Sequence, residues 1–251
     1  MKTTLIFFLA RFGLGGAGNS VYRLVSSLNT NKYEIHIICL GNCAYEKNLK
    51  KKMITVHKIN KKRLLLSLFQ LKEIVNNLCH KNKKNILISN INYTNIFCSL
   101  LFRWNKKIKL IGIERTPLQE LEIYFGLNDF FKKNILKLLL KISYIRFDKI
   151  ICNSNSIVKY LKKKYNIEST YMHPPSIKNI KKKIIKKKYS IKKYLNIVTV
   201  CRLSKEKNIN EILLALNQIK NMKFIFHILG DGPEKNILKS QVNYLGLKKK
   251  S

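Results

Sequence analysis

Residues 4–40 read TLIFFLARFGLGGAGNSVYRLVSSLNTNKYEIHIICL, and this stretch decides the fold. The unbroken apolar run at 4–10 predicts a buried strand, and a glycine-rich loop follows at 11–18. Apolar side chains then recur at helical spacing over 19–28, before a second apolar run at 33–40. A strand, a helix and a strand in this order predict two parallel strands joined by a right-handed crossover.

The same alternation continues beyond residue 40. Further strands are expected at 54–59, 85–89, 108–113 and 149–153. Helices are expected at 64–78, 93–102, 130–144 and 156–165. This pattern predicts an α/β fold, with an N-terminal Rossmann-like domain over residues 1–177 that is built on a doubly wound parallel sheet.

The second part of the chain begins after a lysine-dense segment, 178–193, which is expected to be a linker or a solvated face. Residues 194–251 are expected to form a second, incomplete Rossmann-like domain. Its first helix is predicted at 209–219, and Asn208 with Glu211 can form a start resembling a capping box.

The composition suits a folded protein, because 46% of the 251 residues are hydrophobic. A formal net charge of +37 has three explanations. AT-rich coding alone would favour the Lys, Ile and Asn that the chain uses heavily. An anionic membrane surface is the second explanation, and nucleic acid is the third. Nucleic acid is disfavoured, because the lysine clusters have no interleaved aromatic platform and match no nucleic-acid-binding motif.

The six cysteines include no C-x-x-C pair and stand mostly in apolar runs, which is typical of buried thiols in a reducing cytoplasm.

The opening MKTTLIFFLA superficially resembles a signal peptide, but cleavage there would remove the first predicted strand. Lysines interrupt the best candidate for a membrane span. The protein is therefore expected to be soluble or peripheral. Residues 131–147, FKKNILKLLLKISYIRF, predict either an interfacial helix or a core-packed helix with a basic solvent face.

The loop from Gly13 to Gly18 satisfies the pattern G-x-G-x-x-G between a strand and a helix. An NAD site would also need an acid near the end of the second strand, where the sequence reads CLGN at 39–42, so NAD is disfavoured. The backbone amides at a helix N-terminus still suit an anion. A tight turn that binds nothing is the alternative.

Two segments near the C-terminus suggest a phosphate site. Residues 197–207 read IVTVCRLSKEK, so that Arg202 follows a strand and Lys207 precedes a helix. A guanidinium binds phosphate oxygens bidentately and an ammonium adds a point charge, which together suit a diphosphate. Residues 224–234, FIFHILGDGPE, predict a strand-to-helix turn whose glycines admit unusual backbone angles.

Taken in order, these motifs resemble family 4 glycosyltransferases, retaining enzymes of the two-domain GT-B architecture. The glycine loop looks like that family's N-terminal loop, and DKIICNS at 148–154 is similar to its aspartate, apolar strand and serine. The YMHPP segment at 171–175 lies where members enter the linker. Arg202 and Lys207 match the basic pair on the donor phosphates, and GDGP at 230–233 matches a turn of the second domain.

The resemblance implies transfer of a sugar from a nucleotide donor to a glycan or lipid-linked acceptor in cell-surface polysaccharide assembly, with retained configuration and without a metal or other cofactor. Arg202 and Lys207 would be catalytic. The N-terminal domain would bind the acceptor and the second domain the nucleotide sugar. The residues expected to bind donor or acceptor are Gly15, Gly16, Gly18, Glu114, Arg115, Ser154, Gly230, Asp231 and Gly232.

The sequence also departs from the family pattern. Cys201 and Asn208 stand where glycines are usual, and Gly18 stands where many members have glutamate. The family's pair of donor-binding glutamates has no counterpart, so the chain is expected to be truncated in its second domain and to be a poor transferase. The alternative is a non-catalytic basic α/β protein that binds an anionic membrane or a partner.

Overall fold

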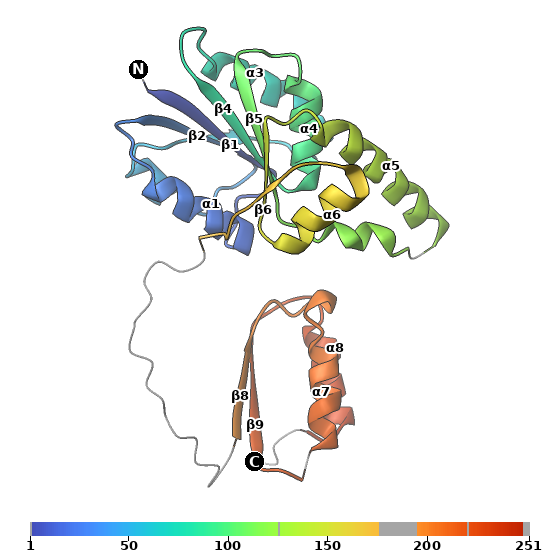
Figure 1. The fold of residues 1–251 in the computed structure, drawn as a ribbon. Helices are drawn as coiled ribbons and strands as arrows, with labels where there is room; N and C mark the ends of the chain where they lie inside the picture. Colours follow the sequence, from blue (N-terminus) through green and yellow to red (C-terminus); the bar gives the residue numbers. More distant parts are fainter. Residues whose placement is uncertain (1, 125, 176–194, 220, 248–251) are drawn as a thin grey trace. The chain divides into compact units, whose positions relative to one another are not determined.

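The computed structural model describes residues 2–124, 126–175, 195–219 and 221–247 (Figure 1). The chain divides into two compact units, Met1–Ile180 and Lys181–Ser251. The lysine-dense segment 178–193, predicted as a linker, lies outside the described residues.

The N-terminal unit is built on a seven-stranded sheet with the order β3-β2-β1-β4-β5-β6-β7. Every pairing in this sheet is parallel, which confirms the predicted fold class. Its strands are β1 Thr3–Leu9, β2 Tyr33–Leu40, β3 Thr55–Ile59, β4 Asn85–Asn90, β5 Ile108–Glu114, β6 Lys149–Cys152 and β7 Thr170–Tyr171. The order runs outward from β1 in one direction and from β4 in the other, so the sheet reverses its winding between these two strands.

Strand β1 lies at the centre of the sheet, and its side chains supply both hydrophobic layers. Phe7 packs with Val21 on one face of the sheet, and Phe8 packs with Leu71 on the other. Val21 and Leu71 belong to two different helices that cover these faces. Because both faces are covered, the strand reads as a continuous apolar run rather than as an alternating one.

The helices of this unit are α1 Gly16–Ser27, α2 Glu46–Lys50, α3 Leu68–Leu78, α4 Asn92–Phe102, α5 Leu127–Tyr144 and α6 Asn155–Tyr165. Two short 3₁₀ helices, η1 Leu65–Ser67 and η2 Leu118–Glu122, precede α3 and α5. Helix α1 begins three residues before the predicted start, because Gly16 and Gly18 lie inside it rather than in the loop. Helix α5 likewise begins at Leu127 rather than at residue 130.

The C-terminal unit contains two parallel strands, β8 Leu195–Val200 and β9 Phe224–Leu229. The helices α7 Ile209–Gln218 and α8 Lys235–Tyr244 follow them, with η3 Lys205–Lys207 before α7. Phe226 and Ile228 pack against the helical residues Leu213 and Leu238. On the other strand, Val200 is 75% exposed.

The predicted capping box at the start of α7 does not form. Asn208 is the residue before the helix, but its side chain makes no capping hydrogen bond. Its backbone is left-handed, with φ of 52°, whereas a capping residue is typically extended.

Candidate functional site: a polar cleft and a basic loop

A cleft of about 530 Å³ lies in the N-terminal unit where the parallel strands end. Its lining comes from α1 and from the segments after β4, β5, β6 and β7. The lining residues are Gly16, Ala17, Asn19, Ser20, Arg23, Ile91, Arg115, Thr116, Asn153, Pro174 and Pro175. Because α1 follows β1 and Ile91 follows β4, the cleft lies at the point where the sheet reverses its winding. Open α/β sheets bind their ligands at this point.

The glycines between β1 and α1 differ in how much space surrounds them. A Cβ on Gly18 would stand 2.1 Å from the carbonyl oxygen of Gly13, so the close approach of helix and loop requires glycine. A Cβ on Gly15 or Gly16 would meet nothing within 4 Å. Gly16 lines the cleft, while Gly15 is the residue before the helix and Gly18 is buried.

The first turn of α1 is open to an anion. It holds no acidic residue, and Gly15 has no side chain with which to cap it. The first amides of a helix have no partners within the helix, and the helix dipole favours negative charge there. This part of the cleft therefore suits a phosphate or a carboxylate.

Two arginines add positive charge to the same cleft. Arg115 donates from Nη1 to Ser20 Oγ at 3.1 Å and from Nη2 to Asn90 Oδ1 at 3.4 Å. Its Nε and the Nη1 of Arg23 are buried and have no hydrogen-bond partner among the described residues. Burial lowers the pKa of Arg115. The lining contains these two guanidinium groups and no carboxylate.

The side chain of Glu114 is fully buried and does not line the cleft. Oε1 accepts from the backbone amides of Arg115 and Thr116 at 2.8 and 2.9 Å. Oε2 accepts from the hydroxyl of Tyr144 in α5. Burial raises the pKa of Glu114, although these hydrogen bonds oppose the shift. The carboxylate thus holds the backbone that carries Arg115 and Thr116, and it acts on the cleft through these two residues.

Tyr144 extends this buried network toward α4. Its hydroxyl accepts from Asn95 Nδ2 at 3.1 Å, and Asn95 Oδ1 in turn accepts from Ser89 Oγ at 2.6 Å. The Asn95 amide also donates to the carbonyl of Ile113 at 3.2 Å. Polar side chains from four elements thus fix the end of β5, and Arg115 is the first residue after this strand.

Ile91 brings backbone strain to the cleft. Its φ is 77° and its ψ is 147°, a combination that is essentially limited to glycine. A β-branched side chain in such a conformation costs about 1–3 kcal/mol. Its amide donates to the carbonyl of Ile113 at 2.8 Å, which fixes the residue at the start of α4.

Ser154 caps a helix rather than lining the cleft. Its Oγ accepts from the amide of Ile157 at 3.4 Å at the start of α6. The preceding residue, Asn153, lines the cleft instead, and its Nδ2 donates to the carbonyl of Arg115 at 3.3 Å.

In the C-terminal unit, Arg202 and Lys207 are both exposed in the segment after β8. Glu206 lies near them. A hydrogen bond from Ser204 Oγ at 2.6 Å is the main reason that the pKa of Glu206 is lowered, and the charges of Arg202 and Lys207 add to the shift. Asn208 follows in a left-handed conformation, which explains how it replaces a glycine here, since asparagine tolerates such angles better than most residues.

The two C-terminal motifs are joined through their backbones. A Cβ on Gly230 would stand 1.9 Å from the carbonyl oxygen of Cys201, and one on Gly232 would stand 2.2 Å from that of Leu203. Neither glycine has a positive φ, so close approach, and not unusual backbone angles, explains both. The Leu203 amide donates to the Asp231 carbonyl at 3.0 Å.

The carboxylate of Asp231 is 80% exposed, and it pairs with Lys235 at 3.2 Å. The hydrogen bond from Lys235 is the main cause of its lowered pKa. The loop after β9 therefore supports the loop that carries Arg202, while the Asp231 side chain faces solvent.

Sequence reasoning missed several cleft residues, of which Ser20, Arg23, Ile91 and Asn153 are the clearest. Arg23 stands one helical turn after Ser20 and Asn19, so helical spacing from the glycine loop could have found it. Ile91 carries no signal, because an isoleucine between a strand and a helix gives no sign of strained angles.

Comparisons with known proteins agree with this fold. Residues 14–175 match the family model of Glycosyltransferase Family 4. The sequence matches none of the curated proteins against which it was compared. The solved structure of Alr3699/HepE from Anabaena, in complex with UDP and glucose, superposes with a TM-score of 0.67 at 11% identity, covering 98% of this chain and 67% of that one.

Two further structures are similar. Sucrose-phosphate synthase from Thermosynechococcus elongatus has a TM-score of 0.70 at 11% identity, with 98% of this chain and 68% of that chain covered. The lipopolysaccharide outer core galactosyltransferase WaaB has a TM-score of 0.60 at 14% identity, with 98% and 65% covered. The chain thus spans about two thirds of the length of these proteins. Because the family match extends over well more than half of the residues, the chain belongs to glycosyltransferase family 4 and has the GT-B fold.

Proposed function

We propose that this glycosyltransferase moves a hexose from a nucleotide sugar to a glycan or lipid-linked acceptor in cell-surface polysaccharide assembly, with retained anomeric configuration. The observation that carries the proposal is the family match over residues 14–175, which includes the cleft at the reversal point of the sheet. The similarity to WaaB, a lipopolysaccharide galactosyltransferase, supports a cell-surface glycan as the product.

The donor would bind through its diphosphate. Arg202 and Lys207 lie in the segment between β8 and α7. Both side chains are exposed, so they can contact the phosphate oxygens of a bound donor. As the bond to the sugar breaks, negative charge grows on the departing diphosphate, and cations placed beside it lower the barrier. UDP is the first nucleotide to test, because the HepE structure holds UDP.

The acceptor would bind in the N-terminal cleft. Arg23, Arg115 and the open first turn of α1 suit an acceptor with an anionic group near the reacting hydroxyl. Glu114 would be a positioning residue, since its carboxylate holds the backbone of Arg115. The enzyme would need no metal ion or other cofactor. It would act in the cytoplasm, at the inner face of the membrane.

The test is transfer from UDP-glucose and UDP-galactose by the full chain, with release of UDP as the measurement. Arg202→Ala and Lys207→Ala should each lower release at least about a hundredfold if they stabilise the leaving diphosphate. Lys223→Ala is the matched control, since Lys223 is exposed beside the opposite ends of the same strands. Equal loss in the control would refute the assigned roles, and an inverted product anomer would refute retention.

A second candidate is a non-catalytic protein that binds a membrane or a partner. The net charge of +37 and the exposed apolar side chains of α5, among them Phe131, Ile135 and Leu138, favour it. Membrane binding without UDP binding would support this candidate over the transferase.

A further inference from the structure

Helix α5 has two apolar faces, of which only one is used in the core. Leu140 and Tyr144 are buried in the cluster that joins α5 to β6 and α6. On the opposite side, five large apolar side chains face solvent. They are Leu127, Phe131, Ile135, Leu138 and Ile142, exposed by 78%, 60%, 59%, 59% and 40%. We call these five residues the α5 stripe.

The α5 stripe is continuous along the helix. Its members are separated by four, four, three and four residues, which places them within an arc of about 80°. The stripe runs about 22 Å along the helix axis. Single exposed apolar side chains are common on protein surfaces, but an aligned set of this length marks an interaction surface. The solvent side of the helix therefore carries a continuous apolar stripe as well as exposed lysines.

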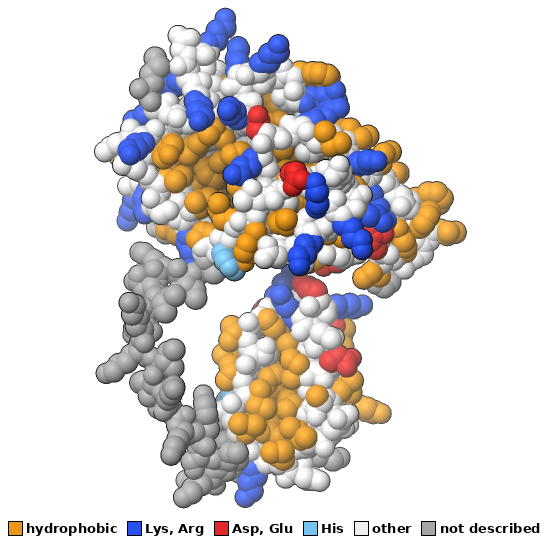
Figure 2. Space-filling view, in the orientation of Figure 1, with side chains coloured by type: hydrophobic (Ala, Val, Ile, Leu, Met, Phe, Trp, Pro, Cys, Tyr) orange, Lys and Arg blue, Asp and Glu red, His pale blue; other side chains and the backbone are white. Residues whose placement is uncertain are grey.

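Basic side chains border the α5 stripe. Lys132 and Lys141 are exposed and lie on its two sides. The helix contains four lysines and a single acidic residue, Asp129, which pairs with Lys133 at 2.7 Å. Figure 2 shows hydrophobic side chains gathered at the edge formed by α5, with Lys and Arg side chains beside them.

A cleft beside the stripe deepens the apolar surface. It has a volume of about 440 Å³ and lies between α4 and α5. Tyr93 and Phe97 line it from α4, Ile135 and Leu139 line it from α5, and Lys132 stands at the same site. Apolar groups that insert along the stripe can therefore also enter this cleft.

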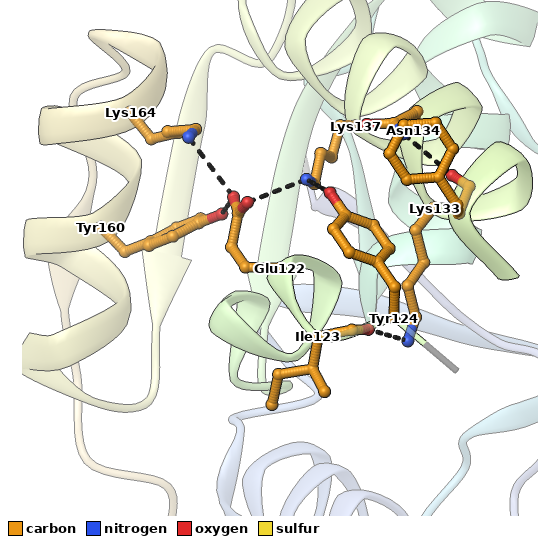
Figure 3. Close-up of polar contacts among 9 residues, drawn as sticks. Glu122, Ile123, Tyr124, Lys133, Asn134, Lys137, Tyr160 and Lys164 are labelled. Carbon is orange, nitrogen blue, oxygen red and sulfur yellow. Dashed lines mark hydrogen bonds and ion pairs between the residues drawn. The ribbon is translucent and has the colours of Figure 1, made fainter. Parts of the chain in front are cut away.

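The helix is fixed in place before any partner binds (Figure 3). Glu122 accepts from Lys137 Nζ at 2.9 Å and from Tyr160 Oη at 2.7 Å, and it pairs with Lys164 at 3.5 Å. These contacts join η2, α5 and α6. The hydrogen bonds from Tyr160 and Lys137 lower the pKa of Glu122 to about 2, so the carboxylate stays charged at any ordinary pH. The stripe is thus a preformed surface, and binding need not order the helix.

We propose that the α5 stripe, with Lys132 and Lys141, docks the N-terminal unit on an anionic lipid bilayer. An apolar stripe with lysines at its borders matches a surface whose headgroups are negative and whose interior is apolar. A second copy of the chain fits less well, because a two-fold contact through α5 would bring lysines against lysines. None of the helices in the described residues is long and apolar enough to cross a bilayer.

The test is sedimentation of the full chain with phosphatidylcholine vesicles that contain or lack phosphatidylglycerol, over a series of NaCl concentrations. Binding should require the anionic lipid and weaken as salt rises. Lys132→Gln with Lys141→Gln should lower the partition coefficient by about thirtyfold, at the usual contribution of one lysine near a charged surface. Lys72→Gln with Lys81→Gln makes the same charge change at exposed lysines elsewhere and should have a much smaller effect.

The apolar part is tested by Phe131→Ser with Leu138→Ser, which should lower binding at least about tenfold. Leu66→Ser with Phe69→Ser is the control, because these side chains are 64% and 80% exposed outside α5. Equal loss in both pairs would overturn the assignment, as would binding to neutral vesicles that salt does not change. A dimer in sedimentation equilibrium that Phe131→Ser dissociates would assign the stripe to a second copy instead. None of these measurements depends on sugar transfer, so they remain decisive if the transferase proposal fails.

Discussion

Gly18→Ala tests the packing that shapes the cleft, because two physical effects predict opposite signs. Gly18 lies inside α1, where replacing glycine by alanine normally stabilises a helix by about 0.5–1 kcal/mol. Here the new Cβ would stand 2.1 Å from the Gly13 carbonyl oxygen. Helix and loop must separate by about 1 Å to relieve this contact, and overpacking of this kind costs about 1–3 kcal/mol.

We therefore expect Gly18→Ala to lower the free energy of unfolding by about 0.5–2 kcal/mol. Gly16→Ala is the matched control. Its Cβ would meet nothing within 4 Å, so it should leave stability unchanged or raise it by up to about 1 kcal/mol.

Urea unfolding followed by far-UV circular dichroism measures the effect. Gly18→Ala should move the urea midpoint down, and Gly16→Ala should not. A Gly18→Ala protein as stable as the unmodified chain would refute the argument from close approach.

Two further predictions concern buried polar groups of the N-terminal unit and use the same unfolding assay. Tyr144→Phe leaves the carboxylate of Glu114 without one of its donors and should lower stability by about 1.5–3 kcal/mol; a change below about 0.5 kcal/mol would contradict the network. His36 and His57 lie 3.2 Å apart at their ring nitrogens, and burial lowers the pKa of both below 6.5. The unfolded chain then binds protons more readily than the folded one, so stability should fall as the pH drops below about 6.5. His57→Gln should reduce that fall, and an unchanged pH dependence would exclude the pair as its source.

The sheet could be predicted from the sequence because buried parallel strands read as continuous apolar runs. Strand β2 was predicted at its observed bounds, and β1 differs by one residue at each end. The start of α1 was missed, since Gly16 and Gly18 have the composition of a loop. Only the approach of the Gly13 carbonyl, visible in three dimensions, explains a glycine inside the helix.

The candidate site was only partly predictable for a similar reason. A charged pair at the end of a strand, Glu114 and Arg115, suggests two exposed side chains. Tyr144, thirty residues later, donates to the glutamate and lies with it in the core, and no local pattern signals that contact. For α5, the sequence has apolar residues at helical spacing on two faces, so periodicity alone could not say which face the core would use.

The two-stranded sheet of the C-terminal unit has a consequence for handling the protein. Within residues 195–219 and 221–247, β8 and β9 pair only with each other, so each has one row of backbone donors and acceptors that no further strand of these residues pairs with. In β8, Val198 and Val200 lie on the same face of the strand and are 57% and 75% exposed. Open strand edges of this composition recruit further strands from other molecules. A fragment limited to residues 195–247 would therefore form fibrillar or amorphous aggregates more readily than the N-terminal unit. The longest strands of that unit lie inside its sheet, and its edge strands β3 and β7 are shorter.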